Sequence, residues 1–574
     1  MTNFYSDNKD IEFSLYSHDW SEIITLKENI FAEDGVYGDA PSSVEEAMEN
    51  YADILELTGE VAGDYIAPRA SSIDEEGCVL EDGVVSYAEG TVAALSKLSQ
   101  ADLMGLPLPR KYGGLNLPTF VCNLVIELVS RAEAGLMTIF GLQEIAETIN
   151  MFGDDEQKAK YLPRFASGEI TGAMVLTEPD AGSDLQAVAL RAVESPDGDG
   201  FLLNGVKRFI SNGCGEVLLV LARSEPKRAG AAGLSLFVCE KGPAVKIRRL
   251  EKKLGIKGSP TCEIQFMDTP AQLIGKRRRG LTHYVMALMN GARLAIAGQA
   301  VGIAQAAYGA ALAFADAREQ FGKKIKEFPL VRDMLVEMIS SIEAARALNM
   351  ETARTIDLDH LLERELDKFT QKDDAFAALK ERRARFKRYA AMLTPMSKLY
   401  ATEICQKVTH DAIQVHGGSG YMKDYPVERH YRDARITNIY EGTSQLQVVA
   451  AIGGVTSGTF MTYIKELDQS LPESVDERLL SMVRNAVDLA GETIVQYNKQ
   501  DEAYRDLYSH EMVDLAVDII LSYLLLKQSV RNERKKSLSS RFIYRTVPMV
   551  RMRASRIASG ECSVLQSFEE IVSV

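Results

Sequence analysis

The segment Tyr440-Glu-Gly-Thr-Ser-Gln445 places a single carboxylate next to a glycine. Because glycine has no side chain, a ligand can approach the neighbouring Glu441 closely. A carboxylate that is partly removed from water becomes a stronger base and can take a proton from carbon. Most glutamates are simply exposed to solvent, so this segment alone is weak evidence for a catalytic base.

Two further segments each end a β-like run with a polar turn. Met174–Asp184 (MVLTEPDAGSD) can point backbone N–H groups and the Thr177 and Ser183 hydroxyls at a polar ligand. Phe209–Gly213 (FISNG) offers an aromatic ring, a hydroxyl and a glycine that can flank a planar ring. Both patterns also occur as ordinary strand ends and Asn-Gly turns, so neither decides a function alone.

Two more segments offer groups that can hold phosphates. In Arg318–Lys323 (REQFGK), the arginine can clamp a pyrophosphate with its planar set of donors, although Gly322 can equally cap a helix there. The glycines of Gln414–Gly420 (QVHGGSG) allow the backbone to approach a phosphate or a ring. This segment matches neither a dinucleotide fingerprint nor a phosphate-binding loop, and His416 alone is more often structural than catalytic.

The elements that must position these segments change character along the chain. Residues 1–155 and 284–455 have helical periodicity, whereas residues 156–283 contain short β-rich runs separated by Gly, Asp and Pro turns. Residues 456–574 form a further helical block. The sequence therefore predicts a mainly α fold with four parts: an N-terminal helical domain, a middle β-domain, a C-terminal helical bundle and an additional helical domain.

Two charged stretches lie outside the five segments. Asp357–Arg388 is highly charged and is predicted to be a solvated helix, inserted into the bundle. Lys527–Arg556 holds ten Lys or Arg residues and one acidic residue, Glu533. Such a basic run can bind phosphates of a nucleic acid, lie against a membrane surface, or face solvent or another subunit.

Composition limits the class of protein. The 574 residues carry a net charge of −16, which disfavours non-specific binding of nucleic acid. The seven cysteines are scattered without a CxxC pair, and no metal-ligand spacing of histidines occurs, so we expect free thiols and no metal. The N-terminus lacks a leader pattern, and we find no long uninterrupted apolar run. We therefore expect a cytoplasmic enzyme.

Taken together, LTEPDAGSD, FISNG, REQFG, QVHGGSG and IYEGTSQ, in this order and at these spacings, resemble the acyl-CoA dehydrogenase family over roughly residues 85–455. Lys253–Cys262 (KLGIKGSPTC) and the two terminal extensions are similar to a long subgroup that includes methylmercaptopropionyl-CoA dehydrogenases. The resemblance implies a helical domain, a β-barrel-like domain and a four-helix bundle, plus a C-terminal helical extension. It also implies FAD, bound between the β-domain and the bundle near a subunit interface.

The resemblance assigns a role to each motif residue. Glu441 matches the family's base; other members carry the base immediately before Arg293, where this chain has Ala292, which cannot accept a proton. Ser183, Arg293 and Gly442 would contact the acyl-CoA substrate. The residues that would contact FAD come from all five segments: Leu176, Thr177, Phe209, Ser211, Arg318, Gln320, Phe321, Gln414, Gly418, Thr443 and Gln445.

The implied reaction belongs to fatty acid metabolism and β-oxidation. Glu441 would remove the α-proton of an acyl-CoA thioester while a β-hydride moves to flavin N5, which leaves a trans-2-enoyl-CoA. The implied partners are an electron-transfer flavoprotein and a second copy of the chain, as a dimer or alternatively a tetramer. Two alternatives stay open: an acyl-CoA oxidase, and a DNA-associated flavoprotein of the same family. We expect no nucleic-acid partner, and membrane association is the less favoured reading of the basic run.

Overall fold

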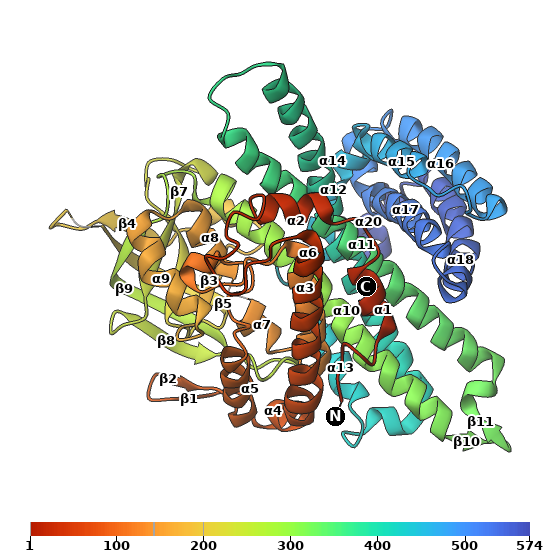
Figure 1. Ribbon diagram of the computed structural model, residues 1–574, viewed down its shortest axis with the longest axis horizontal. Coiled ribbons are helices and arrows are strands. Elements are labelled where there is room, and N and C mark those ends of the chain that lie inside the picture. The colour runs from red at the N-terminus through yellow and green to blue at the C-terminus, as the bar shows by residue number, and fades with distance from the viewer. Residues whose placement is uncertain (1, 142–143, 199, 574) are drawn as a thin grey trace. The chain divides into compact units, whose positions relative to one another are not determined.

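A computed structural model describes residues 2–141, 144–198 and 200–573 (Figure 1). The chain forms two compact units. Unit 1 consists of Met1–Phe328 and Cys405–Glu441, and unit 2 consists of Pro329–Ile404 and Gly442–Val574.

Unit 1 begins with a series of helices. Their bounds are α1 (Lys9–Leu15), α2 (Ser21–Lys27), α3 (Val44–Glu60), α4 (Ala70–Glu76), α5 (Glu89–Gln100), α6 (Thr119–Ala132), α7 (Met137–Phe140), α8 (Glu144–Phe152) and α9 (Asp155–Ala166). A short hairpin of β1 (Val79–Glu81) and β2 (Val84–Ser86) interrupts the series. Helix α9 starts at a capping box, in which the Asp154 carboxylate accepts the backbone N–H of Gln157 and the Gln157 side chain accepts that of Asp154.

Seven strands follow and form the β-domain. They are β3 (Gly172–Val175), β4 (Arg191–Glu194), β5 (Phe201–Ser211), β6 (Val217–Arg223), β7 (Leu234–Glu240), β8 (Val245–Leu250) and β9 (Thr261–Leu273). The strand order is β3-β6-β4-β5-β9-β7, with β8 paired to β9, and an additional pairing of β6 with β7 closes the path into a barrel. Alternate residues of β6 face opposite sides: Leu219 packs in a cluster with residues of α8 and α9, and Leu218 packs with other strand residues.

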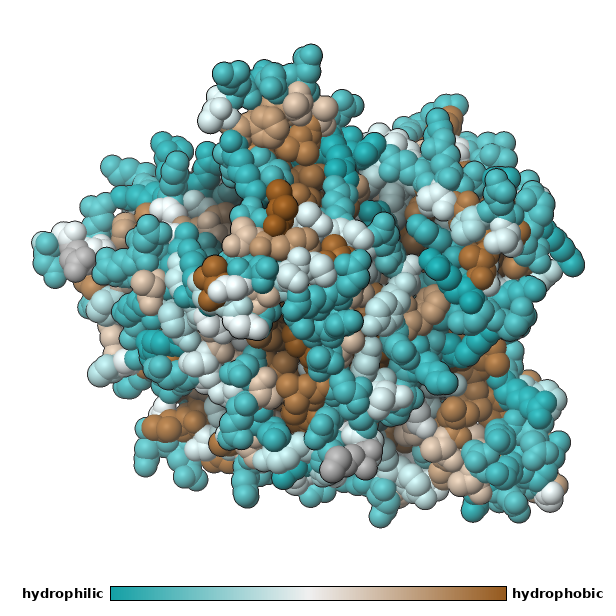
Figure 2. All heavy atoms as spheres, in the orientation of Figure 1, coloured by the Kyte–Doolittle hydropathy of each residue, from teal (hydrophilic) through white to brown (hydrophobic). Residues whose placement is uncertain are grey.

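Helix α10 (Met286–Ala317) is rich in alanine and glycine because it packs closely on α6. An added Cβ at Gly302 would lie 2.4 Å from the carbonyl oxygen of Glu127, so only glycine permits this approach. By length and composition, the helical segment 280–317 is apolar enough to cross a membrane, but half of its most apolar window is buried within the protein. The face of the molecule in Figure 2 is mainly hydrophilic, with apolar residues in scattered groups.

The rest of unit 1 consists of the residues between α10 and Phe328 and of the stretch Cys405–Glu441. A hairpin of β10 (Glu319–Gln320) and β11 (Lys323–Lys324) follows α10, and α13 (Val427–Ala434) precedes Glu441. Unit 1 also holds the C-terminal part of α12 (Asp374–His416), from Cys405 onward.

Unit 2 is helical throughout. Besides the N-terminal part of α12, its helices are α11 (Pro329–Asp367), α14 (Ser444–Thr456), α15 (Thr459–Gln469), α16 (Glu477–Tyr497), α17 (Glu502–Ser529), α18 (Glu533–Ile557), α19 (Ser563–Gln566) and α20 (Phe568–Val572). The predicted fold class is confirmed: the chain is mainly α, with a middle β-barrel and extra C-terminal helices. The stretch 357–388 is more than one solvated helix, because α11 ends at Asp367, α12 begins at Asp374, and Leu361 and Leu362 are buried.

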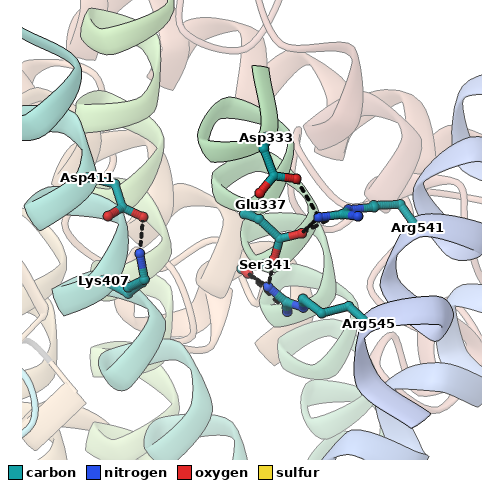
Figure 3. Close-up of polar contacts among 7 residues, drawn as sticks. All are labelled: Asp333, Glu337, Ser341, Lys407, Asp411, Arg541 and Arg545. Carbon is teal, nitrogen blue, oxygen red and sulfur yellow. Dashed lines mark hydrogen bonds and ion pairs between the residues drawn. The ribbon is translucent and has the colours of Figure 1, made fainter. Parts of the chain in front are cut away.

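The basic stretch 527–556 is used inside unit 2. At least six of its ten cations make ion pairs, in most cases with acidic residues of α11 or α17. Arg541 contacts Asp333 at 2.7 Å and Glu337 at 2.5 Å, and Arg545 also pairs with Glu337 (Figure 3). These pairs attach α18 to α11, so much of the basic charge is already balanced within the fold.

Candidate active site

Glu441 occupies an unusual backbone conformation. Its φ is +53°, and Gly442 follows with a φ of +92°. Side-chain crowding makes this region uncommon for residues other than glycine, and it costs roughly 1–2 kcal/mol. The glutamate is half-buried, which removes part of its contact with water. Strained backbone conformations of this kind are frequent at functional sites, which supports a functional role for Glu441.

Arg293 of α10 lies within electrostatic reach of Glu441. Its side chain is 7% exposed, and its Nη1 donates to the Asn290 side chain at 3.2 Å. Within the part of the chain that the structure describes, its Nε makes no hydrogen bond. Burial lowers the pKa of Arg293, and the negative charge of Glu441 opposes this shift. The structure therefore brings together a buried cation and the proposed base.

The chain neighbours of Glu441 are held by buried side chains. The Tyr440 hydroxyl donates to Oε1 of Gln299 on α10, and Gln299 Nε2 donates to the Ala134 carbonyl at 2.9 Å. In unit 2, Nζ of Lys398 donates to the Gly442 carbonyl at 2.6 Å. Sequence reasoning missed Gln299, a polar residue in the apolar helix α10, and Lys398, one of many charged residues of α12, because neither local sequence reveals a buried partner.

Residues 176–177 contact residues 207–208 in the β-domain. The Arg208 N–H donates to the Thr177 carbonyl at 2.9 Å, and Nζ of Lys207 donates to the Leu176 carbonyl at 2.6 Å. Leu176 is buried and Thr177 half-buried. These bonds join the segment Met174–Asp184 to the two residues that directly precede the segment Phe209–Gly213.

A buried ion pair supports this junction. Lys207 is fully buried and its Nζ lies 3.0 Å from Glu178 Oε1. The Glu178 carboxylate also accepts the N–H groups of Ala189 and Leu190 at 2.8 and 2.9 Å. Burial lowers the pKa of Lys207 to about 8, although the charge of Glu178 acts in the opposite direction. The sequence analysis missed this pair, for which the only signal was a lysine within a β-rich run.

Phe209 and Ser211 lie at the C-terminal end of β5. Phe209 has a φ of +60° and is 53% exposed, with the Arg208 guanidinium 4.6 Å from its ring centre. Ser211 is half-buried and pairs with Thr261 of β9. The turn that follows is fixed by Asn212, whose Nδ2 donates to the Gly172 carbonyl at 2.9 Å. An exposed aromatic ring beside a hydroxyl on a fixed turn suits a planar polar ligand.

The remaining predicted residues of unit 1 are exposed. They are Ser183, Arg318, Gln320, Phe321, Gln414 and Gly418. Phe321 is 93% exposed. The buried His416 ring stacks on Phe314 of α10 at 4.3 Å, which brings the 414–420 segment near the end of α10, just before Arg318. Nδ1 of His416 bonds to the Ala412 carbonyl at 2.8 Å, and burial lowers its pKa, so this histidine has a structural role.

Thr443 and Gln445 lie in unit 2, at the start of α14. Thr443 is the N-cap residue of this helix, and Gln445 is exposed in its first turn. The first N–H groups of a helix have no partners within the helix and favour anions such as phosphates.

The loop Lys253–Ser259, part of the segment that suggested a long subgroup, is anchored by buried charges. Nζ of Lys253 donates to the carbonyls of Ile256 and Ser259 at 2.8 and 2.6 Å. The Asp433 carboxylate of α13 accepts the Ile256 N–H at 2.5 Å. Burial raises the pKa of Asp433 to about 7 and lowers that of Lys253 to about 8. This loop therefore connects the β-domain to the helix that precedes Glu441.

No group of three or more His, Cys, Asp or Glu residues is arranged to hold a metal ion in the parts of the chain that the structure describes. All seven cysteines are free thiols.

Three family models match consecutive parts of the chain. These are the acyl-CoA dehydrogenase N-terminal domain at residues 49–169, the middle domain at residues 173–269 and the C-terminal domain at residues 294–445. The matched region therefore contains nearly all of the predicted site residues, including Glu441.

Curated relatives match the same region. An acyl-CoA dehydrogenase of Bacillus subtilis is 38% identical, with 62% of this chain and 86% of the relative covered. An NADH-dependent acryloyl-CoA reductase of Anaerotignum propionicum is 36% identical, with 62% and 84% covered. A 3-methylmercaptopropionyl-CoA dehydrogenase of Ruegeria pomeroyi is 34% identical, with 71% and 72% covered. These similar identities do not single out one subgroup.

A solved structure matches nearly the whole chain. The FAD complex of an acyl-CoA dehydrogenase from Bacillus anthracis aligns with a TM-score of 0.75 over 92% of both chains, at 23% sequence identity. At this identity the match supports the fold, and its extent reaches into the C-terminal helical block.

Proposed function

Because the chain belongs to the acyl-CoA dehydrogenase family, we propose that it oxidises an acyl-CoA thioester to a trans-2-enoyl-CoA, with Glu441 as the base. Membership makes the chain an oxidoreductase. The observation that carries the assignment of the base is the half-buried carboxylate at a φ of +53°, within electrostatic reach of the buried Arg293. Among the predicted site residues, only Glu441 carries a carboxylate.

The residues at the ends of β3 and β5 fit a flavin. Phe209 offers an exposed aromatic face, and Thr177 and Ser211 offer hydroxyls that are half-buried. The N-terminus of α14 after Thr443 suits the phosphates of a dinucleotide. When bound, FAD would accept the hydride equivalent that leaves the β-carbon.

The chain's own residues would perform the proton chemistry. A thioester α-proton is too weakly acidic for an unaided carboxylate, so the developing negative charge on the thioester oxygen must be stabilised. We propose that the backbone N–H of Glu441 donates to this oxygen while its carboxylate takes the proton. The buried Arg293 would keep the carboxylate ionised, because a nearby positive charge favours the charged form.

We also propose a second copy of this chain as a partner. In unit 1, the Phe321 side chain is 93% exposed, between the exposed Gln320 and Gly322. A second subunit could cover this large apolar side chain. Arg318 and Gln320 would then reach the FAD of that subunit. An electron-transfer flavoprotein as acceptor and a cytoplasmic location stay predictions from the sequence.

The DNA-associated alternative has less support. Cations of the 527–556 stretch such as Arg541, Arg545 and Arg553 are paired with carboxylates of the same unit. Phosphate binding through this stretch would require these pairs to be replaced. We expect duplex DNA to bind this protein no more tightly than it binds an acidic control protein. The affinity should not fall steeply as the salt concentration rises.

The test is anaerobic flavin reduction by a panel of acyl-CoA thioesters, which also identifies the acyl group. Wild-type protein should bleach the flavin, whereas Glu441→Gln should retain FAD and fail to bleach it. An oxygen pulse after reduction separates a dehydrogenase from an oxidase. Because one relative is an NADH-dependent reductase, an enoyl-CoA with NADH should be tested as well. A fully active Glu441→Gln variant would remove the assigned base.

A further inference from the structure

Glu441 holds a disfavoured backbone conformation between two chain neighbours that are each anchored by a buried side chain. We propose that Gln299 and Lys398 are positioning residues for the base, acting through Tyr440 and Gly442 respectively. This inference rests on the proposed function, in which Glu441 removes the α-proton.

The Gln299 side chain is oriented before it meets Tyr440. It is fully buried, and its Nε2 donates to the Ala134 carbonyl at 2.9 Å. Because Nε2 already donates to this carbonyl, Oε1 is the amide atom that accepts the hydrogen bond from the Tyr440 hydroxyl. Burial raises the pKa of Tyr440 and the charge of Glu441 adds to the shift, so the phenol stays protonated and remains a donor. The ring of the residue before the base is therefore attached to the core helix α10.

Lys398 acts on the other neighbour, within unit 2. Its ammonium group is fully buried and lies 2.6 Å from the Gly442 carbonyl oxygen, which also accepts Nε2 of Gln447 at 2.8 Å. A carbonyl oxygen has two lone pairs, so both are used. The bond from an ammonium ion is charge-assisted and stronger than a bond between neutral groups.

The surroundings of Gly442 also indicate that the peptide after Glu441 has a fixed orientation. An added Cβ at this position would lie 2.8 Å from Nε2 of Gln447, so a side chain there would displace the donor that fixes the carbonyl. The φ of +92° at Gly442 independently favours glycine. The peptide that follows Glu441 thus has a fixed orientation.

Fixing both neighbours matters because Glu441 itself has a φ of +53°. A return of this residue toward negative φ would change the direction of its carboxylate relative to the substrate α-carbon. A displacement of about 1 Å can slow a reaction about 100-fold without changing its chemistry. Loss of either anchor should therefore act on the rate of proton removal more than on binding.

The experiment uses the FAD-loaded full chain and measures anaerobic flavin reduction at saturating acyl-CoA, together with KM and FAD content. Tyr440→Phe, Gln299→Leu and Lys398→Met each remove one anchor. We expect the reduction rate to fall about 10- to 100-fold with KM and FAD content near wild type. Lys398→Arg keeps the charge and the donor, and should restore most of the rate.

Two matched controls separate positioning from general stability. Tyr463→Phe removes a buried hydroxyl that donates to Glu351 at 2.8 Å, and Lys535→Met removes a buried ammonium that contacts Glu343 at 2.5 Å. Both lie in unit 2 and belong to no part of the proposed site. They should lower the melting temperature while the reduction rate per bound flavin stays at the wild-type value.

The outcomes distinguish the inference from the proposed function. If Glu441→Gln is inactive but Tyr440→Phe and Lys398→Met reduce flavin at the wild-type rate, the anchors do not position the base. The same conclusion follows if the two control variants are slowed equally. If Glu441→Gln is active, the proposed function itself fails. Should Lys398→Met not fold, Tyr440→Phe decides, because it removes a single oxygen atom.

Discussion

The charge of the half-buried Glu441 carboxylate acts on the buried guanidinium of Arg293, and both residues belong to unit 1. Arg293 begins the long buried part of α10, and Glu441 follows the turn after α13. Contacts between α10 and α13 hold these segments together, so two residues 148 positions apart share one electrostatic environment.

We expect Arg293→Gln to move the low-pH limb of the flavin-reduction rate to higher pH. The carboxylate of Glu441 loses a nearby positive charge that favours its ionised form, so fewer molecules carry the active base at low pH. The measurement is the anaerobic reduction rate as a function of pH at saturating substrate. Arg293→Lys serves as the control and should move the limb less. An unshifted limb in both variants would show that Arg293 does not act on the base.

Removal of Glu178 should destabilise the β-domain and weaken FAD binding. Glu178→Ala leaves the buried Lys207 ammonium without its ion-pair partner, and this kind of change costs about 3–5 kcal/mol. Because Lys207 also bonds to the Leu176 carbonyl, the junction proposed to contact FAD should loosen. Urea denaturation of the apoprotein and a titration with FAD measure the two effects separately. Glu169→Ala, an exposed glutamate of the same region, is the matched control and should change neither.

The double variant Glu178→Leu/Lys207→Met tests the cause. It removes both charges, so the penalty of an isolated buried ammonium disappears, and it should be more stable than Glu178→Ala. If the double variant were as unstable as Glu178→Ala, the loss of stability would come from the hydrogen bonds that the Ala189 and Leu190 N–H groups donate to Glu178. It would not come from the ion pair.

Asp433 should make stability fall as pH rises through neutrality. Its pKa is raised to about 7 in the folded chain, against about 3.9 in an unfolded chain. Between these values the folded state binds a proton that the unfolded state does not, so its contribution to the free energy of unfolding decreases with increasing pH. Asp433→Asn cannot ionise, and its amide oxygen can still accept the Ile256 N–H. Thermal melting of both proteins from about pH 5 to about pH 8 should show wild type losing stability relative to the variant. A constant difference would contradict the raised pKa.

The ion pairs between α11 and α18 should be coupled energetically. In a double-mutant cycle, Glu337→Gln and Arg545→Gln should each lower stability, and the combined variant should lose less than their sum, by about 0.5–1 kcal/mol. High salt should reduce this coupling, because both side chains are partly exposed. Urea denaturation at low and high salt provides the measurement. Arg551→Gln changes an exposed arginine of the same helix and should have little effect. Strict additivity would mean that the pair contributes nothing to the attachment of α18.

The sequence alone determined the order of helical and β-rich regions and the residue types that can do the proposed chemistry. Periodicity and turn residues are local properties, so a change from helix to strand and a return to helix could be predicted without a structure. The predicted boundary at residue 156 was wrong by about a helix length, because α9 continues to Ala166 and the first strand of the β-domain begins at Gly172. The joint occurrence of five short segments, including that of Glu441, pointed to one family, although each segment alone also suited an ordinary turn. Candidate site residues on loops at the ends of strands and helices could therefore be predicted from the sequence.

Tertiary structure alone decided which polar residues are buried and what they contact. Gln299, Lys398 and Lys207 are single polar residues in apolar or mixed segments, and nothing in their local sequence names Tyr440, Gly442 or Glu178 as partners. The basic stretch 527–556 was compatible with phosphates, a membrane, solvent or another subunit, yet several of its cations pair with carboxylates such as Glu337, which lies far away in the sequence. Burial and charge pairing depend on which distant segments the fold brings into contact, and this information is not contained in any local pattern.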